Sequence, residues 1–117
     1  MDTEQNGPKN PVVNITNGVI TGVTPNRLPM GTVRGQHIEW SIASTDANAN
    51  YTFPDDGIVI VTPDPSQQFT KLGPNGNGTK FKFHDRNDDV NPYKYTVNIM
   101  NGTTRLTPLD PTIANGE

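Results

Sequence analysis

The chain has 117 residues, a formal net charge of −3 and no cysteine. The length predicts one domain, and the missing cysteine excludes disulfides, thiolate metal sites and cysteine nucleophiles. The nine lysines and arginines are scattered, with no run that could follow a phosphate backbone, so nucleic acid is not an expected partner. No apolar stretch approaches the ~20 residues that span a bilayer, so membrane insertion is not expected either.

Residues 1–10 are polar and aperiodic, and we interpret them as a flexible N-terminal tail. They have neither the basic nor the apolar region of a signal peptide. The protein is therefore expected either to stay in the cytoplasm or to be exported with its signal removed. Residues 11–117 are expected to form a single β-sandwich domain.

The first part of the domain predicts short strands. Residues 12–15 form one, and Asn17-Gly18 can turn the chain into a hairpin; alternatively, both pieces belong to one edge strand broken by a bulge. The two prolines within residues 25–31 indicate a connection. Residues 36–42 alternate, with Trp40 on the apolar side and His37 on the polar side.

Further short strands are predicted at residues 51–53, 58–61 and 69–72. Because residues 58–61 are apolar at every position, that strand is expected to be buried on both faces. The glycine-rich residues 73–78 predict a turn.

Residues 79–106 carry the clearest pattern. Apolar residues occupy every second position in two runs, and Asn101-Gly102 can form a type I′ turn into a third strand. This pattern predicts an antiparallel meander with one solvent-exposed face. The final residues 106–117 are expected to pack back onto the domain through Leu109 and Ile113, without regular pairing at Asp110-Pro111.

No window has a helical stripe, and turn signals recur every ~8–12 residues. The sequence therefore predicts an all-β fold, an antiparallel β-sandwich of about seven to nine short strands.

The segment Tyr93-Lys-Tyr95-Thr-Val97-Asn-Ile99, followed by Asn101-Gly102, resembles the Tyr-x-Tyr-x-Val-x-Val hairpin segment of immunoglobulin-like and fibronectin type III-like domains. Trp40 resembles the core tryptophan on an early strand of those domains. The resemblance implies a cysteine-free, immunoglobulin-like sandwich in which the hydroxyl of Tyr93 or Tyr95 bonds to an upstream backbone group. It implies no particular function.

The most specific candidate for chemistry is the loop that contains Asp85, Asn87 and Asp89. Their side-chain oxygens have the 1, 3, 5 spacing of a Ca²⁺ loop. Val90 stands where such a loop needs glycine, and Thr96 where it needs glutamate, so a solvated loop is the competing interpretation. Asp55-Asp56 would add ligands if the fold brought the two loops together.

The two histidines are His37 and His84. With Asp85 they could bind a transition metal only if residues 36–42 pair beside residues 79–85. Otherwise they are surface histidines. The three serines lie outside any Gly-x-Ser-x-Gly motif, and no enzymatic activity is expected.

The sequence leads to two functional hypotheses. The first is a non-enzymatic binding or structural module without a cofactor, which contacts a protein partner or a second copy of itself through a sheet edge. The second is a Ca²⁺-stabilised carbohydrate-binding module, with Ca²⁺ at Asp85, Asn87 and Asp89 and a sugar against aromatic residues such as Tyr51.

Overall fold

The computed structural model describes residues 9–117. This part of the chain has strands and turns but no helix, which confirms the all-β prediction. It accordingly contains no helix long and apolar enough to cross a membrane. Its twelve strands exceed the predicted seven to nine because several have only two or three residues. They are β1 (Val12–Thr16), β2 (Val19–Thr24), β3 (Arg27–Pro29), β4 (Gln36–Ser44), β5 (Tyr51–Thr52), β6 (Ile58–Ile60), β7 (Phe69–Asn75), β8 (Lys80–Asp85), β9 (Pro92–Val97), β10 (Met100–Asn101), β11 (Thr104–Arg105) and β12 (Thr112–Ala114).

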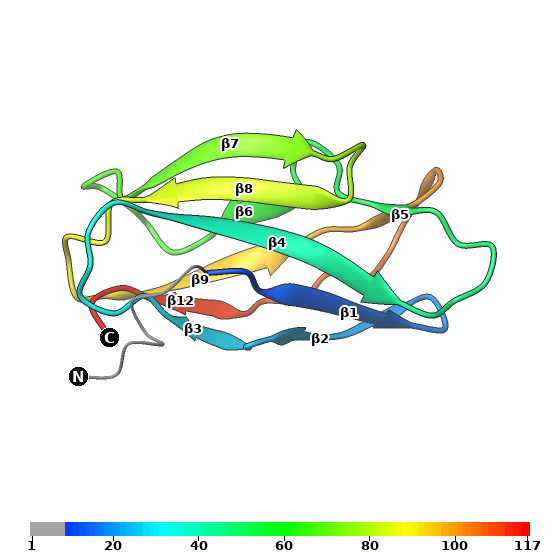
Figure 1. Ribbon diagram of the computed structural model, residues 1–117, viewed down its shortest axis with the longest axis horizontal. Coiled ribbons are helices and arrows are strands. Elements are labelled where there is room, and N and C mark those ends of the chain that lie inside the picture. The colour runs from blue at the N-terminus through cyan, green and yellow to red at the C-terminus, as the bar shows by residue number, and fades with distance from the viewer. Residues whose placement is uncertain (1–8) are drawn as a thin grey trace.

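The strands form a five-stranded sheet in the order β2-β1-β4-β8-β7 and a four-stranded sheet in the order β3-β12-β9-β6. A short third sheet has the order β11-β10-β5. The two larger sheets form the layers seen in Figure 1, an arrangement compatible with a β-sandwich. The prediction of a wholly antiparallel fold was wrong, because β1 runs parallel to β4 and β3 runs parallel to β12.

The hairpin predicted at Asn17-Gly18 is confirmed. Both residues have positive φ, 52° and 75°, as a type I′ turn requires, and Thr16 pairs with Val19. The register shifts at Asn14 and Ile15, so this strand also contains a bulge. Asparagine and glycine tolerate positive φ better than other residues, which explains why this turn could be predicted from the sequence.

The predicted meander over residues 79–106 was wrong in its pairing. Strand β8 pairs with β4 and β7, whereas β9 pairs with β12 and β6, so the two strands lie in different sheets. The β10–β11 hairpin exists, but its turn is Gly102-Thr103, and β10 pairs on its other side with β5. Period-2 alternation determines which face a side chain occupies and leaves the neighbouring strand undetermined.

Three local predictions also change. Strand β6 is an edge strand whose Val59 is 40% exposed, so it is not buried on both faces. The connection predicted at residues 25–31 contains the short strand β3. Strand β7 continues to Asn75 through part of the predicted turn, and Pro74 fits there because β7 lies at a sheet edge.

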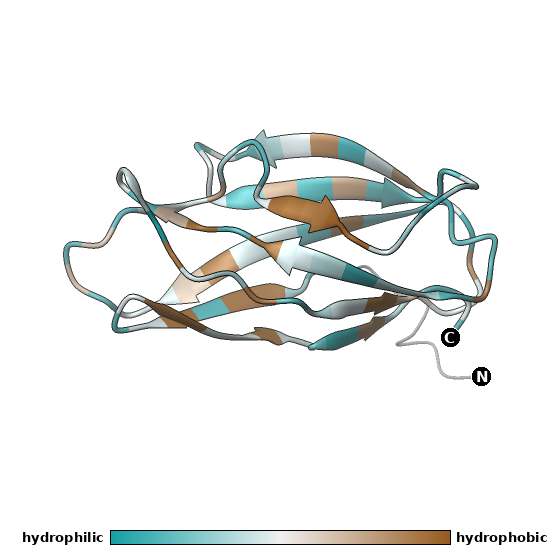
Figure 2. Cartoon of the chain, turned by 180° about the vertical axis from the view of Figure 1, so that it is seen from behind, coloured by the Kyte–Doolittle hydropathy of each residue, from teal (hydrophilic) through white to brown (hydrophobic). Residues whose placement is uncertain are grey.

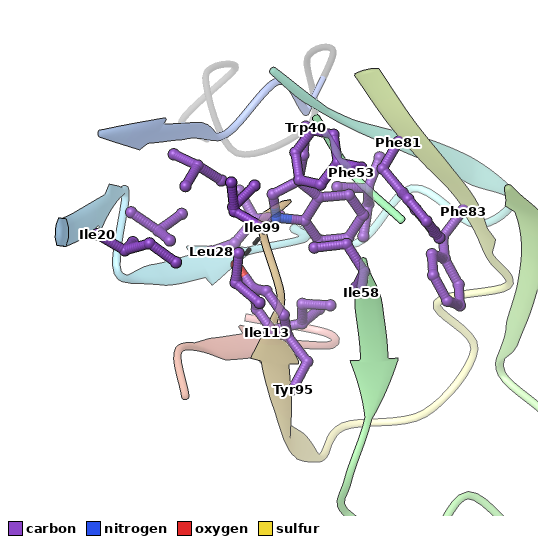
Figure 3. Packing of buried hydrophobic residues seen from close by; sticks show 14 of the residues in the cluster. Ile20, Leu28, Trp40, Phe53, Ile58, Phe81, Phe83, Tyr95, Ile99 and Ile113 are labelled. Carbon is purple, nitrogen blue, oxygen red and sulfur yellow. Dashed lines mark hydrogen bonds between the residues drawn. The ribbon is translucent and has the colours of Figure 1, made fainter. Parts of the chain in front are cut away.

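Side chains from both layers form one apolar core, as Figure 3 shows. Trp40 and Tyr95 are fully buried on the inward faces of β4 and β9, as the alternation predicted. Their rings pack edge to face with centroids 5.3 Å apart, and Trp40 Nε1 donates a hydrogen bond of 3.0 Å to the Tyr95 hydroxyl. This contact joins the two layers at their centre. Burial raises the pKa of Tyr95 to about 12, against a smaller lowering effect of the bond from Trp40.

Tyr95→Phe is expected to lower the free energy of unfolding by about 1–2 kcal/mol, because the buried indole N–H of Trp40 loses its acceptor. Urea denaturation of both proteins measures the difference. Tyr93→Phe provides the comparison, since the Tyr93 hydroxyl bonds to the carboxylate of Asp89 instead of a core side chain. Equal stability of Tyr95→Phe and the parent protein would contradict a structural role for the indole bond.

Candidate functional site

The loop proposed for Ca²⁺ lies where the chain leaves β8 and crosses to β9, at the same end of the molecule as the C-terminus (Figure 1). Asp85 is the last residue of β8 and is fully buried. Its Oδ1 accepts a hydrogen bond of 2.9 Å from the backbone N–H of Asn87. Asp85 continues the inward phase of Phe81 and Phe83, so the alternation already contained the signal for its burial.

Asn87 is also buried and has a positive φ of 49°. Its side-chain amide donates to the carbonyls of Gly31 at 3.0 Å and Val33 at 2.8 Å, and more distantly to Met30. Its Oδ1 accepts from the backbone N–H of Gly116 at 2.8 Å. The side chain therefore ties three segments of the chain together, and its one oxygen already has a donor.

Asp89 is half-buried, and both of its oxygens accept hydrogen bonds. Oδ1 accepts from Asn115 at 2.9 Å, while Oδ2 accepts from the Tyr93 hydroxyl and from Asn91. The immunoglobulin resemblance implied a backbone bond from the hydroxyl of Tyr93 or Tyr95, whereas here the Tyr93 hydroxyl bonds to Asp89 and the Tyr95 hydroxyl to Trp40, both side chains. Burial, followed by the interaction with Asp89, raises the pKa of Tyr93 to about 12.

Asp85, Asn87 and Asp89 thus lie at the same end of the molecule, but their side chains bond to different protein groups. Within residues 9–117, no three His, Cys, Asp or Glu side chains gather where they could hold one metal ion. Asp55 and Asp56, the other acidic pair, form ion pairs with Lys71 and Arg105. The 1, 3, 5 spacing could not indicate that Asn87 uses its side chain to bond to buried backbone groups of other segments.

Two further buried polar residues, Gln68 and Asn115, lie among Asp85, Asn87 and Asp89, and we call these five residues the polar cluster. Sequence reasoning missed Gln68 and Asn115. Both are almost fully buried, and the amide of Gln68 joins the backbone N–H and the carboxylate of Asp88. This bond from Gln68, followed by the bond from Arg86, lowers the pKa of Asp88. Since Gln68 and Asn115 lie 47 positions apart, no local pattern connects them.

The cluster contains two buried oxygens that lack a hydrogen-bond partner among the described residues, Asp85 Oδ2 and Asn115 Oδ1. Burial raises the pKa of Asp85 to about 7, with smaller lowering effects from Asn87 and Asn115 and smaller raising effects from the charges of Asp89 and Asp64. Protonation removes the buried charge of Asp85 and gives its carboxyl an O–H donor.

The pairing condition that the sequence set for the two histidines is met. Strands β4 and β8 are antiparallel neighbours, and His37 lies directly opposite His84. Asp85 is not a third ligand there, because it is on the inward face of β8 while His84 is on the outward face.

Tyr51, the aromatic residue proposed for sugar binding, lies at the other end of the molecule. Its hydroxyl donates to Asp46 at 2.6 Å, and this bond, followed by those from Asn17 and Gly18, lowers the pKa of the Asp46 carboxyl. Gln36 of β4 pairs with Asp85, whereas the opposite end of β4, at Ser44, contacts Asp46. Those ends are about 26 Å apart along the strand, so one site cannot include both Tyr51 and the Asp85 loop.

A hollow of about 320 Å³ lies between the edge strands β6 and β7, and we call it the β6–β7 groove. Its lining is largely apolar and contains three charged side chains. The lining residues on β6 are Ile58, Val59 and Ile60; Phe69 and Lys71 come from β7, Phe83 from β8, and Asp56 and Asp64 from the adjoining loops.

Comparison of the sequence with protein-family models and with curated proteins finds no match. The fold therefore defines only the structural class of the protein, which is all-β with several sheets.

Proposed function

We propose that this chain is an immunoglobulin-like β-sandwich module without enzymatic activity, which binds an extended segment of a partner protein at the free edge of β6. The observation that carries the proposal is the unprotected edge of β6 beside the β6–β7 groove. The contact between Trp40 and Tyr95 across the layers supports the immunoglobulin-like assignment.

Strand β6 has backbone groups available to a partner. The Val61 N–H bonds to Lys94 of β9, and the Gly57 carbonyl accepts from Asn98, the residue after β9, so alternate residues on this strand turn toward β9. Ile58 and Ile60 accordingly direct their N–H and C=O groups away from it. Ile60 is half-buried and Ile58 is 1% exposed, so the groups of Ile60 are the ones that a partner can reach in this structure. No other strand of residues 9–117 pairs with β6 on that side, so an added strand would satisfy these groups.

Two of the other edges of the larger sheets carry features that discourage pairing, while the third, β2, contains neither lysine nor proline. Strand β7 contains Lys71, Pro74 and a register shift, and β3 ends at Pro29. Strand β6 contains only isoleucine and valine, and Figure 2 shows it hydrophobic along its whole length. Val59 and the adjacent Val61 are 40% and 57% exposed. The edge of β6 combines this apolar run with the adjoining β6–β7 groove, which distinguishes it from the edge of β2 and favours it as the place for a partner strand.

Charge argues for a different protein as the partner and against a second copy. Acidic residues flank β6 on both sides, with Asp55 and Asp56 before it and Asp64 after it. Antiparallel pairing of two β6 strands would bring the first pair of one copy toward Asp64 of the other, and like charges directly opposite are destabilising. A segment with alternating apolar residues and basic ends would meet opposite charges instead, because the ion pairs of Asp55 with Lys71 and of Asp56 with Arg105 are exposed and contribute little in solvent.

The test uses two synthetic peptides that alternate valine with threonine, one with lysine at both ends and one with aspartate. Titration into ¹⁵N-labelled protein, followed by two-dimensional NMR, is expected to shift the amide signals of Ile58 and Ile60 with the lysine peptide. Val59→Lys is expected to weaken that binding by roughly tenfold, about 1.4 kcal/mol. Val19→Lys on the edge strand β2 is the matched control and should bind like the parent, since Val19 is similarly exposed.

Light scattering across a range of protein concentrations completes the test, and we expect a monomer throughout. Equal binding of both peptides would contradict the charge argument. Unchanged signals of Ile58 and Ile60 with the lysine peptide, or a dimer that Val59→Lys dissociates, would overturn the proposal that this edge receives a different protein.

A further inference from the structure

The outward face of the five-stranded sheet places the two histidines of the chain side by side. His37 on β4 is exposed, and His84 on β8 is half-buried. Their rings meet edge to face, with centroids 5.2 Å apart and planes inclined at 71°. We propose that His37 and His84 form a two-imidazole site for a divalent transition metal of the Zn²⁺, Ni²⁺ or Cu²⁺ type, independent of the β6 edge.

The register of the sheet brings these side chains as close as cross-strand neighbours come. The N–H groups of Glu39 and Ser41 bond to residues before β1, so residues 37, 39 and 41 turn their backbone groups away from β8. His37 and His84 therefore form a non-hydrogen-bonded pair, the type in which opposite side chains lie nearest.

The separation of the rings fits a shared metal. A Zn–N bond of about 2.1 Å and an imidazole radius of about 1.1 Å place each ring centroid about 3.2 Å from the metal, so a tetrahedral angle separates the two centroids by about 5.2 Å. The observed centroid distance is 5.2 Å. Rotation of each ring about its metal–nitrogen bond leaves this distance unchanged, so the inclination of the planes is compatible with joint coordination.

The donor set selects the class of metal. Imidazole nitrogen favours Zn²⁺, Cu²⁺ and Ni²⁺, whereas Ca²⁺ and Mg²⁺ prefer oxygen. Because residues 9–117 bring no group of three His, Cys, Asp or Glu side chains together for a metal, water would complete the coordination. The next cross-strand pair, Glu39 opposite Lys82, has opposite charges, and Arg86 on the other side of the histidines forms an ion pair with Asp88. These neighbours therefore add no net positive charge.

Isothermal titration calorimetry of the full, tag-free chain with Zn²⁺ and with Ni²⁺ tests the site. We expect one ion per chain, no response to Ca²⁺, and binding weakened by roughly tenfold or more in both His37→Ala and His84→Ala. Either substitution leaves a single imidazole, so the metal loses its second protein ligand and the gain in affinity from two ligands held in one chain. Ser41→Ala, a change on the same outward face of β4, is the matched control and should bind like the parent.

Cu²⁺ electron paramagnetic resonance gives a second measurement that does not depend on affinity. Hyperfine coupling to two nitrogens in the parent protein and to one in each histidine variant would support joint coordination. Zn²⁺ binding that survives His37→Ala unchanged, one ion shared by two chains, or no binding of Zn²⁺ and Ni²⁺ would overturn the proposal. Circular dichroism of each variant confirms that a loss of binding does not reflect unfolding.

Discussion

Asp85→Asn is expected to stabilise the protein at pH 8 and to leave its stability nearly unchanged at pH 4. Asp85 is fully buried, and burial raises the pKa of its carboxyl from 3.8 to about 7. At pH 8 the native protein therefore holds a buried negative charge that the unfolded chain exposes to water. Asparagine has similar volume and cannot ionise, so it removes the buried charge.

The direction of the pH dependence follows from proton binding. Between pH 4 and 7 the native state binds more protons at Asp85 than the unfolded state does, so this residue's contribution to stability falls as the pH rises through that range. Above pH 7 the loss is complete and amounts to at most roughly 4 kcal/mol for a shift of this size. Asp85→Asn removes this residue's contribution to the slope of unfolding free energy against pH.

Urea denaturation at half-unit steps between pH 4 and 8 measures the effect. Asp55→Asn is the matched control, because its side chain is 90% exposed and its ion pair with Lys71 contributes little in solvent. It should follow the parent curve. Parallel curves for the parent and Asp85→Asn would contradict a raised pKa for this carboxyl.

Asn87→Ala is expected to lower the free energy of unfolding by about 3 kcal/mol. The substitution removes the amide that donates to the carbonyls of Gly31 and Val33, and the oxygen that accepts from Gly116. It also leaves alanine at a φ of 49°, which costs roughly 1 kcal/mol because its Cβ crowds the backbone. Thermal or urea denaturation gives the change.

Two comparisons separate the possible roles of Asn87. Asn87→Gly loses the same hydrogen bonds but accepts the positive φ, so it should be the more stable variant by roughly 1 kcal/mol. Melting in millimolar Ca²⁺ and in EDTA should give the same Tm for the parent, since the Asn87 oxygen already has a donor. If Ca²⁺ raised the Tm of the parent but left the Tm of Asn87→Ala the same as in EDTA, Asn87 would be a Ca²⁺ ligand.

Local chemistry made part of this fold predictable. Alternation correctly placed Trp40 and Tyr95 inward, because successive side chains of any strand point to opposite faces. The prediction of the Asn17-Gly18 turn was correct because few pairs of residues adopt positive φ at two successive positions. The absence of a helical stripe led to the correct class, although the number of strands came out too low.

The choice of neighbouring strands could not be obtained in this way. Strands β8 and β9 look like partners in the sequence, yet the loop between them crosses from one layer to the other, where Asn87 anchors it. Pairing between distant strands depends on the whole set of core contacts, and a strand's own alternation is the same beside any neighbour.

The same contrast between local and long-range interactions applies to the candidate sites. The sequence by itself determined the all-β class, the inward and outward faces of its main strands and the first turn. Only the tertiary structure decided that Asp85 would be buried beside Asn115, that His37 would lie opposite His84, and that β6 would be left as a free edge. Each of these depends on segments far apart in the chain, because burial and strand pairing arise from long-range packing while alternation and turns are local.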